Sequence, residues 1–144
     1  MNAKGFLYAA QMTNALAREI PESTWDESLM DELGTLRKLF IHIIRVRDVY
    51  RDGMKSGKVV FPGHLPAQER DWFDELERSM TDLAGEFERS HWDQQILMGA
   101  EQMTALELLN TAVQHEGIHQ GQYFVALKRA GIELPEQWRR DWNM

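Results

Sequence analysis

The feature that most restricts the fold of this chain is an apolar pattern with the period of an α-helix. Between residues 33 and 50 apolar side chains recur every three or four positions, at Leu33, Leu36, Leu39, Phe40, Ile43, Val46 and Tyr50. This spacing places them on one face of a helix, which must be buried against other elements. Similar stripes precede Pro21, follow Pro66 and follow Thr104. We therefore expect helices to form nearly all of the fold.

Boundary signals divide the chain into four helical segments. They are Pro21 after the first helix, Gly53 and Gly57 at the end of the second, Pro66 as the first residue of the third, Thr104 as the capping-box start of the fourth and Gly131 as its stop. The connections are about ten residues or longer, which exceeds the need of a tight bundle. The sequence predicts an all-α fold, a single domain over residues 1–144 that forms a four-helix bundle with long inter-helix connections.

Three segments outside these helices have expected conformations. The Pro- and Gly-rich stretch 58–66 has room for a very short strand, and residues 95–98 for a short extended piece. The tail from Glu136 to Met144 contains Trp138 and Trp142, so we expect it to pack back on the bundle.

Composition excludes several classes of function. The chain has no cysteine, which rules out disulfides, iron–sulfur clusters and a cysteine nucleophile. Its net charge is −7 and its basic residues are mostly neighbours of acids, so we expect no nucleic-acid partner. No stretch approaches the roughly 18 apolar residues of a membrane span, and the N-terminal segment lacks an apolar signal core. We expect a cytoplasmic protein without a membrane partner.

Three of the five histidines form a candidate metal site. His115 and His119 are four residues apart, which stacks two imidazoles on one helix face, although an unrelated pair would have the same spacing. His42 interrupts the apolar run 39–44, where burying it would cost about 1–3 kcal/mol without a polar partner. Taken alone, His42 is more simply a core histidine bonded to a carbonyl or an acid. A ligand on one helix and a pair on another is, however, how bundles build interior metal sites. Three neutral imidazoles with an open position match a catalytic zinc-type sphere.

The same segment also matches the zincin pattern H-E-x-x-H, in which Glu116 would be the catalytic base of a metalloprotease. The extended form of the motif is missing, because Gln122 stands where its glycine would be. Glu116 therefore has three alternatives: a catalytic base, a residue that orients a ligand, or a helix-packing acid.

Neighbouring residues on the fourth helix suggest further roles. Gln122 shares the face of the histidine pair, so it is a candidate for the cavity wall or for a cofactor-binding contact that orients a ligand. Gly117 and Gly121 each cost a helix about 1 kcal/mol relative to alanine, which predicts close approach of a neighbouring helix. His64, in the Pro- and Gly-rich loop, is interpreted as a surface histidine, with a place over the site mouth as the alternative.

The residues that carry a family resemblance lie in the second and fourth helices. The segment from Thr104 to Pro135, with His115-Glu-Gly-Ile-His-Gln-Gly-Gln-Tyr at its centre, resembles the last helix of DinB-like proteins, which are bacterial damage-inducible four-helix metal-binding proteins. The stretch around His42 resembles their second helix. The resemblance implies that His42, His115 and His119 are the ligands of a divalent metal ion, usually zinc or nickel, and that a homodimer is a reasonable assembly.

The better-understood proteins of this kind are bacillithiol S-transferases and mycothiol-dependent maleylpyruvate isomerases. The resemblance therefore implies a metal-dependent enzyme that activates an external small-molecule thiol toward an electrophile, or else water for hydrolysis. A metal-binding stress-response protein without turnover is the main alternative, and a metalloprotease is a remote one.

Overall fold

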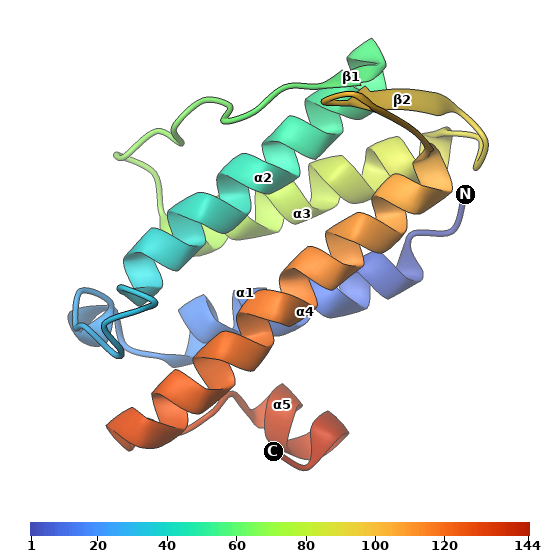
Figure 1. Cartoon of the computed structure of the whole chain (residues 1–144). Coiled ribbons are helices and arrows are strands. Elements are labelled where there is room, and N and C mark those ends of the chain that lie inside the picture. The colour runs from blue at the N-terminus through green and yellow to red at the C-terminus, as the bar shows by residue number, and fades with distance from the viewer.

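The computed structural model describes all 144 residues and consists mainly of helices (Figure 1). The long helices are α1 (Lys4–Glu19), α2 (Leu36–Ser56), α3 (Trp72–Arg89) and α4 (Ala105–Ala130). A single 3-10 turn, η1 (Glu22–Thr24), follows α1, and a short helix, α5 (Glu136–Trp142), ends the chain. The four predicted helices are therefore present, and α5 is an addition that the sequence did not indicate.

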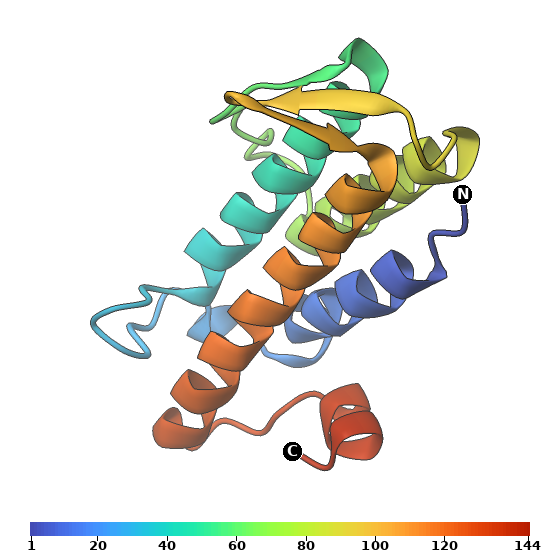
Figure 2. The same cartoon turned by 45° about the vertical axis from the view of Figure 1, so that its right-hand side comes forward.

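Each long helix packs against two others. α1 contacts α3 and α4, while α2 contacts α3 and α4, so the bundle closes in the order α1, α3, α2, α4. The two views in Figures 1 and 2 show α4 running beside α1 and α2 over most of its length, with α5 folded back below it. This order places α2 and α4 side by side, which is the pair of helices that carries the three candidate histidines.

A three-stranded sheet at one end of the bundle corrects the all-α expectation. Its strands are β1 (Lys58–Val59), β2 (Gln95–Met98) and β3 (Glu101–Thr104). β1 pairs with β2 in parallel, and β2 forms an antiparallel hairpin with β3 (Figure 2). The predicted extended pieces became β1 and β2, whereas β3 was missed because its sequence shows no apolar alternation. The sheet joins the end of α2 to the beginning of α4.

The observed helix ends show which of the predicted boundary residues begin or end a helix. Thr104 forms the predicted capping box with Glu107, and Gly131 ends α4 with a φ of 70°. The prediction that the third helix begins at Pro66 is wrong, because Asp71 caps the helix by accepting a hydrogen bond from the Asp74 amide. Side-chain capping thus outweighs the preference of proline for a first helical position.

The end of α2 is set by one of its two candidate glycines. Gly57 is the C-cap, with a φ of 85° that suits a residue without a side chain. Gly53 lies inside the helix, where an added Cβ would meet the Val59 Cγ2 atom at 2.5 Å. Gly53 therefore lets β1 pack closely on α2.

The interior contains two apolar clusters with a polar layer between them. One cluster surrounds Phe6, Leu83 and Leu108, and the other surrounds Leu16, Phe40 and Leu76. Buried polar residues from all four long helices form this layer: Thr13, Asn14, Arg47, Ser79, Glu116 and Gln120. Burial of so many polar groups requires that they bond to one another.

The tail confirms the expectation that it packs back on the bundle. Trp138 is fully buried, and its indole Nε1 donates to the Met12 carbonyl at 2.8 Å. Trp142 remains more than half exposed beside α1. The tail therefore closes the second apolar cluster with one of its two tryptophans.

The prediction of a close helix contact at Gly117 and Gly121 is wrong. An added Cβ at either position would meet no atom within 4 Å. Both glycines instead line a hollow of about 460 Å³ between α1, α4 and α5. This hollow is the largest of the molecule and lies away from the histidines.

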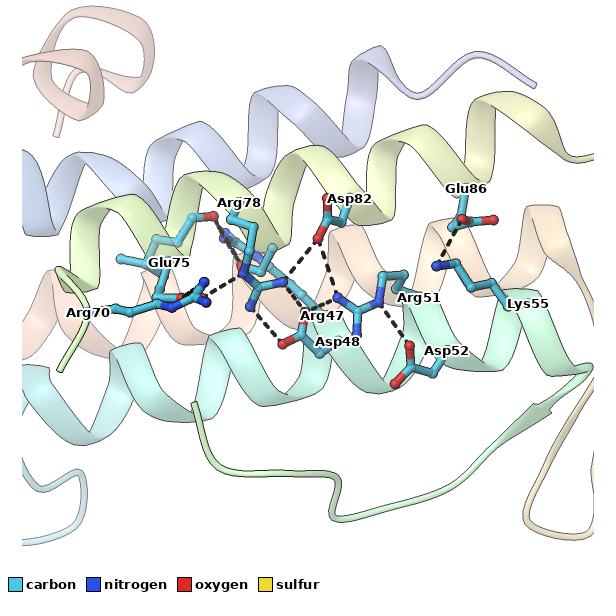
Figure 3. A network of polar contacts seen from close by, with 12 residues as sticks. Arg47, Asp48, Arg51, Asp52, Lys55, Arg70, Glu75, Arg78, Asp82 and Glu86 are labelled. Atoms are coloured by element: carbon cyan, nitrogen blue, oxygen red, sulfur yellow. Dashed lines mark hydrogen bonds and ion pairs between the residues drawn. The ribbon is translucent and has the colours of Figure 1, made fainter. Parts of the chain in front are cut away.

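The outer faces of α2 and α3 are joined by a network of charged side chains (Figure 3). Arg78 of α3 contacts Asp48 of α2 at 2.9 Å and also bonds Glu75 and Asp82. The hydrogen bonds that Arg78 donates, above all those to Asp48, raise the pKa of Arg78 further above its usual range. No helix of the chain has both the length and the apolar character needed to cross a membrane.

Candidate metal centre

His42, His115 and His119 come together at the contact between α2 and α4. The Nε2 atoms of His42 and His115 lie 3.0 Å apart, and those of His115 and His119 lie 3.2 Å apart. One nitrogen of each ring falls within 4.8 Å of the others. The structure therefore brings together the three residues that the sequence singled out.

The spacing of the three rings fits a single metal ion. Imidazole nitrogens bound to one zinc ion at 2.0–2.1 Å are separated by about 3.3 Å in a tetrahedral arrangement and by about 2.9 Å at right angles. The observed separations of 3.0 and 3.2 Å lie between these values. The three donors are all imidazoles, which suit zinc, nickel, copper and iron, and their bound forms are neutral. The residues thus fit a divalent ion with further positions open.

Gln122 orients one of the three rings. The Nδ1 atom of His119 lies 3.0 Å from Gln122 Oε1, which can only accept a hydrogen bond. Nδ1 of His119 must then carry the proton, which leaves the lone pair of Nε2 free to bind an ion. Such a partner behind a ligand fixes both its tautomer and its direction. The structure places Gln122 beside the ligands, as its position on the helix face suggested.

The centre lies at the surface, which corrects the expectation of a site in the bundle interior. His42 is exposed, whereas His115 and His119 are partly buried. Burial lowers the pKa of His115 to about 4, with a smaller contribution from the charge of His119. Burial also lowers the pKa of His42, and the charges of His119 and Arg45 add to the effect. Below pH 7 these two rings therefore stay neutral longer than a free histidine, which favours metal binding.

Comparisons with known proteins identify the family and the fold of the chain. The model of the DinB family matches residues 3–138, nearly the whole chain. The chain belongs to the DinB family. The crystal structure of a DinB-like protein (YjoA) from Bacillus subtilis superposes with a TM-score of 0.75 at 23% sequence identity, over 92% of this chain and 94% of that one. This likeness establishes the shared fold, and no curated protein matches the chain.

Next to the histidine cluster, Glu116 takes part in a buried ion pair. Arg47 Nε donates to Glu116 Oε1 at 2.7 Å, and Arg47 Nη2 donates to Oε2 at 3.1 Å. The Thr13 hydroxyl also donates to Oε2. Both charged side chains are only 1% exposed. Of the three roles considered for Glu116, this geometry matches the helix-packing acid, since neither oxygen is free to reach a ligand or a water molecule.

Arg47 is the central residue of the polar layer, and sequence reasoning missed it. Its guanidinium also donates to Asn14 Oδ1 at 3.0 Å, to the Leu76 carbonyl at 2.9 Å and to the Ala10 carbonyl at 3.2 Å. It thereby bonds groups on α1, α3 and α4 from its place on α2. A signal for it was present, because Arg47 lies on the same helix face as Ile43 and Tyr50, where a charge must find a partner.

Two hollows have His42 in their walls. One has a volume of about 380 Å³ and is lined by Glu32, Leu33, Lys38, Leu39, His42, His119, Gln122 and Tyr123. The other measures about 160 Å³ and is lined by His42, Arg45, Val46, Phe61 and Pro62. His64 is exposed and borders a third hollow without any of the three histidines. Each of the first two hollows therefore gives a small molecule access to His42.

Proposed function

We propose that this DinB-family protein is a metal-dependent enzyme that activates a small-molecule thiol for transfer to an electrophile. The observation that carries the proposal is the convergence of three imidazole nitrogens at the surface, beside two hollows and without a carboxylate ligand. Zinc or nickel is the proposed ion. Activation of water for hydrolysis at the same centre is the variant of this reaction that needs no thiol.

The chemistry follows from the charge of such a centre. An ion held only by neutral ligands keeps its full positive charge and lowers the pKa of a thiol or water in its open position. The thiol would release its proton to solvent. Its sulfur would then bond to an electrophilic carbon, for example of an aromatic ring, while the bond from that carbon to a leaving group such as chloride breaks. Because the chain contains no cysteine, the thiol must be supplied from outside.

The residues of this chain would have separate roles at the proposed centre. His42, His115 and His119 hold the ion, and Gln122 keeps the proton of His119 on Nδ1. The hollow that contains Lys38 and Gln122 has the volume for a thiol or an electrophile. Glu116 serves the fold and is not proposed as a catalytic residue.

The second candidate function is a metal-binding stress-response protein without turnover. Hydrogen bonds from Arg47 and Thr13 occupy both Glu116 oxygens, which leaves the histidine pair without an adjacent carboxylate base. This geometry favours the function without turnover. The same geometry counts against a metalloprotease, in which that glutamate must activate the attacking water.

Metal analysis and a thiol assay separate these functions. We expect about one equivalent of zinc or nickel in the purified protein and a large loss in His42→Ala. His91→Ala is the matched control, because His91 is exposed and bonds only Asp93. Full metal content in His42→Ala would exclude the three-histidine centre. Absence of metal-dependent conjugation of a chlorinated aromatic with any low-molecular-weight thiol would favour the second candidate.

We also propose that the protein acts in the cytoplasm and that it forms a homodimer, the assembly that the family resemblance implies. Light scattering on the purified chain should give twice the monomer mass of 16.8 kDa. A monomer at micromolar concentration would contradict the assembly without bearing on the metal centre.

A further inference from the structure

Arg45 lies one helical turn after the ligand His42 and has no acidic partner. Every arginine other than Arg45 and Arg129 forms an ion pair with a carboxylate. Arg129 is exposed near the end of α4, where water solvates its charge, whereas Arg45 is partly buried. A partly buried cation without a counter-ion is unexpected in a chain whose net charge is −7.

The guanidinium of Arg45 has unused hydrogen-bond donors. Its Nη2 atom donates to the Gly63 carbonyl at 2.9 Å. Its Nε atom is buried and has no hydrogen-bond partner, the one such side-chain atom in the molecule. Leaving a buried donor unpaired destabilises the folded chain. An acceptor that arrives with a ligand would recover this free energy.

The surroundings of Arg45 place this donor beside the histidine centre. Arg45 and His42 line the same hollow of about 160 Å³, whose remaining wall is formed by Val46, Phe61 and Pro62. Residues three apart on a helix have Cβ atoms about 5–6 Å apart, so one small molecule can reach both side chains. The walls offer no carboxylate that would compete for the guanidinium.

We propose that Arg45 binds the carboxylate of an acidic substrate whose sulfur, or oxygen, occupies the histidine centre. The inference rests on the proposed function of that centre and adds the class of substrate, a short mercapto-carboxylic acid. The planar fork of arginine matches the two oxygens of a carboxylate and gives it a stronger bond than a neutral amide. Arg45 is thus a specificity-determining residue that selects acids over uncharged thiols.

A purely structural role for Arg45 makes a different prediction. In that case the guanidinium only holds the loop at Gly63 against α2, where an added Gly63 Cβ would lie 2.4 Å from Val49 Cγ2. Loss of the loop contact would then weaken binding of charged and uncharged ligands alike. The ratio of the two affinities separates the roles.

The test is a binding titration on protein loaded with cobalt(II), followed by the sulfur-to-cobalt absorption. The ligands are 3-mercaptopropionate and its uncharged amide, which differ only in the group that Arg45 would bind. We expect the wild type to bind the acid about tenfold more tightly than the amide. This factor is at the lower end of what a hydrogen bond to a charged group contributes, because the site is partly exposed. In Arg45→Gln the two affinities should become equal while that of the amide stays unchanged.

A control variant removes the same charge elsewhere. Arg129→Gln changes the other unpaired arginine, which is exposed near the end of α4. This variant should keep the tenfold preference. An unchanged ratio in Arg45→Gln, an equal loss for both ligands, or loss of the ratio in Arg129→Gln would overturn the proposal.

Failure of the proposed thiol activation would be recognised separately. If neither thiol changes the cobalt spectrum, calorimetry with 3-hydroxypropionate and its amide on the same metal-loaded protein decides the role of Arg45. Preference for the acid that disappears in Arg45→Gln would support the carboxylate site, and equal binding of the two, or binding of neither, would refute it.

Discussion

Replacing Glu116 by glutamine distinguishes a structural acid from a catalytic base. The change keeps the shape of the side chain and removes its charge. Arg47 would then be a cation in the core without a counter-ion, since both side chains are 1% exposed. We expect a large loss of stability in Glu116→Gln, with the fold and the three histidines retained.

The magnitude follows from the contacts of the pair. Removing one partner of a buried ion pair costs about 3–5 kcal/mol. The glutamine oxygen can still accept from Arg47 Nε, now 2.7 Å from Glu116 Oε1, and the new amide can donate to the Thr13 hydroxyl. Because these bonds remain, we expect the loss of stability to be at the lower end of this range, about 3 kcal/mol. This is a large share of the 5–15 kcal/mol that stabilises a typical domain.

Urea unfolding at pH 7, followed by circular dichroism, measures this loss. Glu133→Gln is the matched control, because the Glu133 side chain is 78% exposed and should change the free energy of unfolding by less than about 0.5 kcal/mol. The reasoning would be refuted if Glu116→Gln unfolded at the wild-type urea concentration. Wild-type stability combined with lost turnover would identify Glu116 as the base instead.

A double-mutant cycle measures the interaction between the Arg47 and Glu116 side chains in a second way. Arg47→Met with Glu116→Leu removes both charges together, so the double variant should be less destabilised than the sum of the single variants by about 2 kcal/mol or more. Simple additivity would show that the two charges do not stabilise each other.

Three further predictions concern the histidines and the helix glycines. Gln122→Ala should weaken metal affinity about tenfold or more, measured by competition with a chelator, because His119 loses the acceptor that fixes its tautomer. Gly117→Ala and Gly121→Ala should each raise the free energy of unfolding by up to about 1 kcal/mol, whereas Gly53→Ala should lower it, because only the last Cβ meets a neighbour. Metal-free protein should lose stability as the pH falls from 6.5 toward 4, by at most about 3 kcal/mol, and melting curves of His115→Gln should show a smaller loss. The sign follows because the folded pKa of His115 is about 4 and the unfolded one 6.5, so the unfolded chain takes up the proton first. Equal pH dependence in both proteins would contradict this assignment.

The parts of the fold that sequence predicts are those encoded locally. The capping box at Thr104, the stop at Gly131 and the apolar stripes each act within one or two helical turns. β3 was not predictable in this way, because its residues are held by backbone pairing with β2 and not by a pattern of their own. The start of α3 was misjudged because two adequate signals compete, and only the chain geometry decides between Pro66 and Asp71.

For the candidate site, too, the sequence predicts the features that are encoded locally and misses those that depend on contacts between helices. The three histidines were found because a polar residue in an apolar run and an i, i+4 pair are local features. The exposure of His42 was not predictable from this pattern, because Leu39, three residues before it, and Val46, four residues after it, lie on the same side of the helix and are buried. The Arg47–Glu116 pair could not be assigned, since neither residue alone reveals which helix supplies its partner.

The bidentate bond between Arg47 and Glu116 fixes more than stability. Arg47 follows His42 by five residues, and Glu116 directly follows His115. A guanidinium that grips both oxygens of a carboxylate, at 2.7 and 3.1 Å, resists rotation of α2 and α4 about their long axes. The three rings therefore face one another before any ion arrives, and little conformational entropy is lost when one binds. For the proposed metal centre we therefore expect ions to be selected by the geometry that they accept, since the helices do not turn to accommodate them.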